Sequence, residues 1–230
     1  MSFTYKYPRP AVTVDAVLFG VDEEGLKILL IKRRDNPFKD CWALPGGFVD
    51  VDGDDTTEDA VARELQEETN LSNIYLEQLY TFSKKGRDPR ERVVTVAYLG
   101  LVRPESLKPI AGDDAKEVGW FSVQSLPDLA FDHADIVKMG LDRIRSKVRY
   151  QPVGFELLPE MFTIVQIQNL YEKLLQRDLD RSYFHKKITA MGILTPVPYM
   201  EHGLGRPSQM YKFNRESYQQ KLKEGFNFEL

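Results

Sequence analysis

Apolar and polar residues alternate along the first part of the chain in a way that is typical of β-strands. Residues 11–19 and 26–31 form two such stretches, and the turn sequence of residues 22–25 separates them. Alternation with a period of two places every second side chain on one face of a strand, and short turns that contain Gly join adjacent strands. The pattern therefore predicts a β-hairpin near the N-terminus.

Further strand and helix patterns follow the hairpin. A helix is expected from Asp55, which has the spacing of a capping box with Glu58, to about Thr69. Residues 134–150 repeat their apolar positions at helical spacing. Apolar stretches predict strands at residues 74–82, 93–102 and 118–121. This order of elements predicts an α/β domain, an α+β sandwich with a mixed sheet, over residues 1–150.

The composition changes after residue 150. Residues 151–161 contain Pro and Gly and predict a linker between two domains. Beyond it, Thr163 and Gln166 have the spacing of a capping box ahead of an apolar pattern with helical period. Asp180 can cap a second helix that ends near Gly192. A short turn between two helices is typical of a helix-turn-helix.

Two strand patterns follow this helix pair. Residues 193–200 and 209–213 are predicted strands, and residues 201–208 between them contain Gly and Pro and predict a tight tip. Two helices followed by such a hairpin predict a winged helix-turn-helix domain in residues 162–230. The alternative is a small tail that serves only dimerisation.

The most specific chemical signal is an acidic cluster in the first predicted helix. Glu64, Glu67 and Glu68 stand at positions i, i+3 and i+4, so their carboxylates share one helical face. Several oxygen ligands on a rigid element suit a hard divalent cation such as Mg2+, which also binds substrate phosphates. A solvated surface is the usual fate of acidic residues, but Arg63 within the cluster and Leu65 on the opposite side favour a site.

Residues 46–71 resemble the Nudix box, G-x5-E-x7-R-E-U-x-E-E-x-G-U, in which U is aliphatic. The positions that fit are Gly47, Arg63, Glu64, Leu65, Glu67, Glu68 and Leu71. The loop after Gly47 is two residues longer than in the pattern, Asp55 stands where the pattern has Glu, and Asn70 replaces the last Gly. Asn tolerates the left-handed conformation that ends a helix. The resemblance implies a fold that holds Mg2+ or Mn2+ against a nucleoside diphosphate linked to another group.

The same resemblance implies roles for individual residues. The residues implied in catalysis are Arg63, Glu64, Glu67 and Glu68. The implied metal ligands are a backbone carbonyl and four carboxylates, from Gly46, Glu64, Glu67, Glu68 and Glu117. Glu117 represents the acidic residue that family enzymes often add from a later loop, and Asp114 is the other candidate. For both residues, simple exposure to solvent is the alternative.

A second group of residues resembles the Arg-Asp-Pro-x-x-Arg loop of the ADP-ribose-directed branch of the family. The residues expected to contact substrate are Arg34, Phe48, Arg87, Asp88, Arg90 and Arg92. Guanidinium groups bind phosphate through paired hydrogen bonds, although a loop of alternating charges can also be a salt-linked hairpin tip. Arg33 is a further candidate. His133 and His202 show no ligand spacing and are expected to be structural.

Charge is distributed unevenly along the chain. The formal net charge is −4, yet residues 181–223 hold eight basic residues and two acidic ones. This excess suits a polyanion. The second helix of the helix-turn-helix would offer short and basic side chains to phosphates and base edges, and the tip would reach a minor groove. The residues expected to contact DNA are Arg181, Ser182, His185, Lys186, Lys187 and Arg206.

A Nudix domain followed by a winged helix resembles the Nudix-related transcriptional regulators of bacteria. The resemblance implies that the chain binds double-stranded operator DNA and responds to ADP-ribose or a related metabolite. One winged helix reads a short half-site, so a homodimer is expected. The alternative is a Mg2+-dependent ADP-ribose pyrophosphatase with an accessory domain. A single cysteine, Cys41, and no long apolar run predict a cytoplasmic protein without disulfides or membrane segments.

Overall fold

The hairpin near the N-terminus is present in the computed structural model, which describes residues 6–112, 115–197 and 208–226. Its antiparallel strands are β1 (Ala11–Asp22) and β2 (Gly25–Arg33). The other strands of this sheet are β3 (Trp42–Ala43), β4 (Gly46–Phe48), β5 (Glu77–Phe82), β6 (Val93–Val102) and β7 (Ala115–Ser122). The sheet is mixed, with the order β3-β2-β1-β6-β5, with β4 on β1 and β7 on β2, and with a parallel pairing of β1 and β6.

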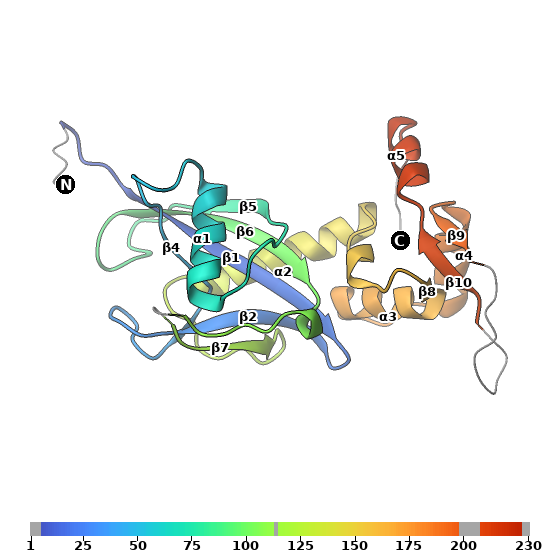
Figure 1. The fold of residues 1–230 in the computed structure, drawn as a ribbon, viewed down its shortest axis with the longest axis horizontal. Coiled ribbons are helices and arrows are strands. Elements are labelled where there is room, and N and C mark those ends of the chain that lie inside the picture. The colour runs from blue at the N-terminus through green and yellow to red at the C-terminus, as the bar shows by residue number, and fades with distance from the viewer. Residues whose placement is uncertain (1–5, 113–114, 198–207, 227–230) are drawn as a thin grey trace. The chain divides into compact units, whose positions relative to one another are not determined.

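Helices cover both faces of this sheet (Figure 1). The helix α1 (Thr57–Thr69) packs its apolar side on one face. The helix α2 (His133–Tyr150) lies on the other face, where its Gly140 leaves room for Val17 and Phe19 of β1. A Cβ atom on Gly140 would lie 3.1 Å from each of those two side chains. The predicted mixed-sheet sandwich is therefore confirmed.

The two ends of α1 test the predicted caps. The start was predicted wrongly: Thr56 and Asp59, rather than Asp55 and Glu58, form the capping box. The Asp59 N–H donates to Thr56 Oγ1 at 3.1 Å, and the Thr56 N–H donates to Asp59 Oδ2 at 3.0 Å. Both pairs have the same spacing, so the pattern alone does not separate them. The end is as predicted, because Asn70 has a left-handed backbone with φ of 57°.

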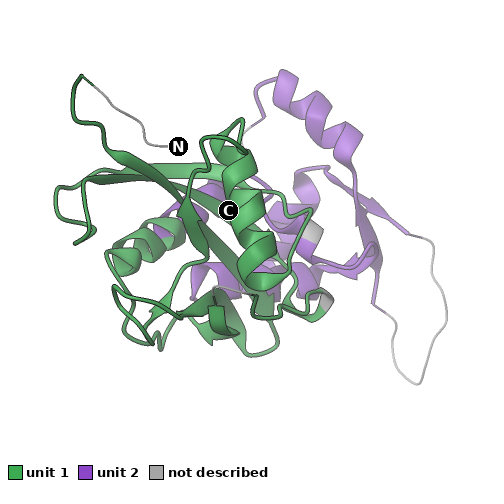
Figure 2. Cartoon of the chain, turned by 60° about the vertical axis from the view of Figure 1, so that its left-hand side comes forward, with its two compact units in different colours: residues 1–141 green, residues 142–230 purple. Residues whose placement is uncertain are grey.

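Contacts divide the chain into two units, residues 1–141 and 142–230, so the division falls inside α2 (Figure 2). The second unit continues with η2 (Phe155–Leu157), β8 (Phe162–Thr163), α3 (Ile164–Leu175), α4 (Arg181–Ala190), β9 (Leu194–Pro196), β10 (Met210–Phe213) and α5 (Arg215–Lys223). Its sheet has the order β8-β10-β9. This arrangement is the predicted winged helix-turn-helix. Residues 198–207, which include most of the predicted tip, lie outside the described residues.

Both predicted caps of the second unit are confirmed. Thr163 and Gln166 form the capping box of α3, and Asp180 accepts a backbone N–H from the first turn of α4 at 2.7 Å. The segment expected to be a linker also packs in this unit, because Phe155 is buried and stacks on Phe213 with ring centroids 4.5 Å apart. None of the described helices is long and apolar enough to cross a membrane.

Side chains hold the turn between α3 and α4. Gln168 is buried, and its Nε2 donates to Glu172 Oε1 at 2.9 Å and to the Leu179 carbonyl at 3.0 Å. Glu172 Oε1 also accepts the Leu179 N–H at 3.0 Å. A negative charge in the last turns of a helix is unfavourable because of the helix dipole. The hydrogen bonds that Glu172 accepts from Gln168 and Leu179 offset this cost. They fix the turn that leads into α4.

Candidate functional site

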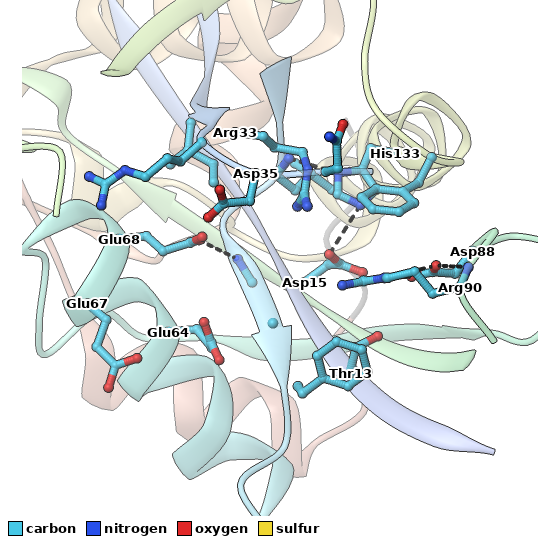
Figure 3. Close-up of a pocket in the computed structure, with 18 of the residues that line it drawn as sticks. Thr13, Asp15, Arg33, Asp35, Glu64, Glu67, Glu68, Asp88, Arg90 and His133 are labelled. Atoms are coloured by element: carbon cyan, nitrogen blue, oxygen red, sulfur yellow. Dashed lines mark hydrogen bonds and ion pairs between the residues drawn. The ribbon is translucent and has the colours of Figure 1, made fainter. Parts of the chain in front are cut away.

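A cavity of about 420 Å³ opens in the first unit beside β1 (Figure 3). Side chains from β1, β2, β4 and α1 line it, together with loops that carry Arg34, Arg87 and Phe131. Figure 3 shows Glu64 and Glu68 on one side of the cavity, opposite Arg90. A ligand in this cavity would therefore meet opposite charges at two places.

The acidic side consists of Glu64, Glu67 and Glu68 and is called the acidic wall below. Its three residues line the cavity from one face of α1, as the spacing predicted. Glu68 is buried, and its Oε2 accepts the Gly46 N–H at 2.8 Å. A Cβ atom on Gly47 would lie 2.5 Å from Glu64 Oε1. The two glycines therefore bring the backbone of β4 directly against the carboxylates.

Arg63 holds the acidic wall together. Its NH1 donates to Glu64 Oε1 at 2.9 Å and to Glu67 Oε2 at 3.0 Å. Asp54 accepts from its Nε at 3.0 Å and from its NH2 at 2.8 Å. The bonds to Asp54 and Glu64 raise the pKa of Arg63 above its usual range, and Arg63 lowers the pKa of Asp54. Asp54, in the loop before α1, is therefore the acidic partner of Arg63, and sequence reasoning did not single it out.

The donor chemistry of the acidic wall fits a divalent metal ion. Carboxylate oxygens on one rigid helix, next to a glycine backbone, are the ligands that Mg2+ and Mn2+ accept. Within the described parts of the chain, no three His, Cys, Asp or Glu side chains already converge as they would around an ion. Glu64 and Glu67 instead point at Arg63. A metal ion would therefore compete with Arg63 for Glu64 Oε1 and Glu67 Oε2.

Glu117, one of the two acidic candidates from the later loop, does not join this wall. Glu117 lies on β7, outside the cavity lining, and pairs with Lys32 of the neighbouring β2 at 2.8 Å, with 57% of its side chain exposed. Asp114 lies outside the described residues. The loop reaches α1 through its backbone, since the Gly112 N–H donates to the Glu68 carbonyl at 3.1 Å.

The opposite side combines arginines with aromatic rings and is called the arginine–aromatic wall: Arg33, Arg90, Phe48 and Phe131. The Arg90 guanidinium lies 4.9 Å from the ring centroid of Phe48 and 5.8 Å from that of Phe131. The Arg33 guanidinium lies 4.9 Å from Phe131. Burial lowers the pKa of Arg33, and the charge of Arg90 adds to this, although a guanidinium stays protonated. Two like charges in one cavity favour an anionic ligand.

In the predicted substrate loop, residues 87–92, some residues line the cavity and others do not. Asp88 is buried and holds Arg90, accepting its backbone N–H at 2.8 Å and its NH2 at 2.8 Å. The Arg87 side chain is only 5% exposed, and it donates from Nε and NH2 to the two oxygens of Asp132 at 3.0 and 2.7 Å. Both residues line the cavity, whereas Arg92 is exposed and lies outside the lining.

Arg34 lines the cavity at its other edge. Its NH2 lies 3.5 Å from the Gly112 carbonyl and 3.4 Å from the Ala115 carbonyl, so it reaches the loop behind α1. Of the residues expected to contact substrate, the structure brings Arg34, Phe48, Arg87, Asp88 and Arg90 to one cavity.

Asp15 and His133 form the floor of the cavity; sequence reasoning missed Asp15 and expected His133 to be structural. The His133 Nδ1 accepts the Leu44 N–H at 2.9 Å, so its proton is on Nε2, which lies 3.4 Å from Asp15 Oδ1. Thr95 donates to the other oxygen of Asp15 at 2.6 Å. A carboxylate in the middle of an otherwise apolar strand was a usable signal for Asp15. His133 had none, because its partner is a backbone group distant in sequence.

The helix α4 carries five of the six residues predicted to contact DNA. Arg181, Ser182, His185 and Lys186 are exposed. Lys187 is half-buried, with its Nζ 5.5 Å from the ring of Tyr183, an exposed aromatic residue that sequence reasoning did not single out. On the opposite side, Phe184 and Ile188 are buried in the core of the unit. Arg206 lies outside the described residues.

Comparison with known families agrees with both units. The family described as the NUDIX domain matches residues 9–139, and the NrtR DNA-binding winged helix domain matches residues 154–213. The first match covers more than half of the chain. The chain therefore belongs to the NUDIX family, with an NrtR-type winged helix in its second unit.

Two relatives match different extents of the chain. The ADPR responsive transcriptional repressor NtrR of Acinetobacter baylyi is 36% identical over 92% of this chain and 85% of its own length. The ADP-ribose pyrophosphatase of Methanocaldococcus jannaschii is 48% identical over 57% of this chain and 73% of its own length. The repressor thus matches both units, and the enzyme matches a little over half of the chain.

Solved structures of Shewanella oneidensis NrtR are also similar. Its complex with a 27mer DNA has a TM-score of 0.75 and 32% identity, and the match covers 94% of this chain and 97% of that chain. Its NUDIX domain complexed with ADP ribose has a TM-score of 0.55 and 37% identity, over 60% of this chain and 90% of that chain. These similarities extend to the arrangement of the elements.

His133 makes stability depend on pH in a defined direction. Burial lowers its pKa below the ordinary value of 6.5, so below that pH the unfolded chain binds a proton that the folded chain does not. We expect the free energy of unfolding to be highest above pH 6.5 and to fall as the pH decreases from about 7 to 5, by at most ~1.4 kcal/mol per pH unit from this group. Denaturant titrations at each pH measure it.

The variant His133→Gln keeps an acceptor for Leu44 but cannot titrate. It should show a shallower pH dependence over the same range, whereas His185→Gln, which changes an exposed histidine of α4, should match the wild type. If the free energy of unfolding depends equally on pH in all three proteins, His133 is not the group that causes the dependence.

Proposed function

We propose that this protein is a transcriptional regulator that senses ADP-ribose in its Nudix domain and binds operator DNA through its winged helix. One observation carries the proposal. The same chain contains a cavity with an acidic wall and an arginine–aromatic wall, and a helix-turn-helix whose second helix is basic and exposed. The similarity to an ADPR responsive repressor over both units supports it. Because it acts on the chromosome, such a protein would work in the cytoplasm.

The chemistry of ADP-ribose suits the two walls. Its pyrophosphate is an anion that Arg33 and Arg90 would attract, and its adenine is a flat aromatic group that can stack on Phe131 or Phe48. Glu64, Glu67 and Glu68, with the Gly46 carbonyl, would hold Mg2+ or Mn2+. A bound divalent ion would neutralise the negative charge of the pyrophosphate.

The winged helix would bind DNA as part of a homodimer. A single recognition helix contacts a short half-site, and two-fold symmetric dimers read pseudo-palindromic operators. Arg181, Lys186 and Lys187 would contact phosphates or base edges, and Ser182 and His185 would contribute hydrogen bonds. Arg206 would extend the interface from the wing.

A second function has its own supporting observation. The three carboxylates of the acidic wall are intact, and an ADP-ribose pyrophosphatase is 48% identical over a little more than half of the chain. The alternative is therefore a metal-dependent hydrolase that splits the pyrophosphate of ADP-ribose, in which the second unit serves assembly. Arg63 would then orient the carboxylates.

The regulator proposal is tested by a mobility shift on the DNA upstream of the protein's own gene. We expect retardation of this DNA, and a change of several-fold in apparent Kd when ADP-ribose is added. Lys186→Ala should weaken binding and reduce the slope of log affinity against log salt by about one, because one phosphate contact is lost. Lys138→Ala, which removes an exposed charge from α2, is the matched control. Retardation equal to that of unrelated DNA would refute the proposal.

Arg90 and Arg92 offer a matched pair for the ligand site. Arg90 lines the cavity, whereas Arg92, two residues away, lies outside the lining. Arg90→Ala should weaken ADP-ribose binding by roughly 10- to 100-fold, the usual loss for a charge-assisted hydrogen bond. Arg92→Ala, originally expected to contact substrate, serves as the comparison. If titration calorimetry finds the larger loss of ADP-ribose affinity in Arg92→Ala, Arg92 and not Arg90 contacts the ligand.

Metal binding is tested at Glu68. Glu68→Gln keeps the size of the side chain and an acceptor for the Gly46 N–H, but it removes the charge that a cation needs. Affinity for Mn2+ should fall at least about tenfold, because the carboxylate is lost as a ligand. Glu58→Gln, exposed on the same helix, should have no effect. Unchanged affinity in Glu68→Gln would remove this residue from the metal site.

The same proteins distinguish sensing from hydrolysis. Release of AMP from ADP-ribose by the wild type with Mn2+, abolished in Glu68→Gln, is the result expected from the hydrolase alternative. A wild type that binds ADP-ribose and returns it intact supports a sensor.

A further inference from the structure

Three consecutive residues each hold a different part of the ligand cavity. Phe131 belongs to the arginine–aromatic wall. Asp132 accepts two hydrogen bonds from Arg87, at 2.7 and 3.0 Å. His133 accepts the Leu44 N–H at 2.9 Å, just ahead of β4 and its glycines. Residues 131–133 therefore connect three parts of the cavity: the arginine–aromatic wall, the loop that carries Arg87, and the backbone beside the acidic wall.

These residues lead directly into α2, which enters the second unit. The helix runs without a break from His133 to Tyr150, and the division between the units falls after Leu141. One continuous helix thus joins the first unit, which contains the cavity, to the second unit. Inside the second unit, Arg145 of α2 donates to the side chain of Gln176. Gln176 is the C-cap of α3, with φ of 53°, and begins the turn that leads to α4.

We propose that occupancy of the cavity is passed to the DNA-binding helix through residues 131–133 and α2, with Asp132 as the positioning residue. This rests on the proposed function of the cavity as a sensor of ADP-ribose. The Arg87 NH2 lies 2.7 Å from Asp132 and 3.6 Å from Asp15, so one guanidinium stands between two carboxylates.

A bound pyrophosphate supplies a third anion beside Arg87, which lines the cavity. When Arg87 turns toward it, Asp132 loses its bidentate partner, and the first turn of α2 is released from the substrate loop. A ligand alters DNA affinity only if it binds two arrangements of the protein unequally. The exchange of partners by Arg87 provides two such arrangements.

The test measures coupling rather than binding alone. For the full-length protein, the apparent Kd for upstream DNA is measured with and without saturating ADP-ribose, and ADP-ribose affinity is measured separately by calorimetry. In the wild type the ratio of the two Kd values should be of the order of 5 to 150, as allosteric couplings usually are. Asp132→Asn should still bind both ligands, but the ratio should fall to within about twofold of one.

Asp135→Asn is the matched control, because it makes the same chemical change on the exposed side of the first turn of α2. It should keep the wild-type ratio. If Asp132→Asn does not fold, Arg87→Lys decides, since lysine keeps the charge but cannot form the bidentate bond.

The outcomes separate this inference from the proposed function. A wild type whose DNA affinity ignores ADP-ribose overturns both. A wild type that responds to ADP-ribose, with Asp132→Asn or Arg87→Lys that responds equally, leaves the regulator intact and overturns the route through Asp132.

Discussion

The site depends on the close approach of the backbone at Gly46 and Gly47 to β1 and α1. A Cβ atom on Gly46 would lie 2.1 Å from the Val14 carbonyl oxygen, and one on Gly47 would lie 2.5 Å from Glu64 Oε1. Either side chain would push β4 away from β1 or displace a carboxylate. Glu68 closes the same junction by accepting the Gly46 N–H. Two glycines thus allow a strand and the acidic face of a helix to meet, which larger residues would prevent.

Each wall of the cavity carries its own counter-charge, and this keeps the cavity polar. Arg63 lies among the carboxylates of the acidic wall, and Asp88 holds Arg90 on the other side. Pairing within each wall offsets part of the charge that would otherwise attract the other wall. An anionic ligand can then compete with Asp88 for Arg90, and a cation can compete with Arg63 for Glu64 and Glu67.

Local patterns in the sequence predicted the elements and the metal-type cluster, because period and capping depend on neighbours in the chain. Strands of two or three residues, such as β3 and β4, carry no readable period and were not predicted. The assignment of Asp55 as the helix cap failed because Thr56 and Asp59 have the same spacing one residue later and form the capping box instead. The expectation that Glu117 is a ligand fails because β7 pairs with β2 and places Glu117 beside Lys32, a contact that the local pattern does not encode. His133 depends on its contact with Leu44, which is distant in the chain, so no local pattern encodes its place, whereas Asp15 stands out as a carboxylate within an apolar strand.

The magnitudes favour Arg87 as the point where binding energy changes the protein. Allosteric coupling usually needs about 1–3 kcal/mol. Separation of one partner from a buried ion pair typically costs about 3–5 kcal/mol, because the remaining charge is left without compensation. With Asp15 also near Arg87, the guanidinium keeps one carboxylate neighbour when it leaves Asp132 for a ligand phosphate. A fraction of the free energy that separates Arg87 from Asp132 therefore matches the size of an allosteric coupling, and it acts at the start of a continuous helix.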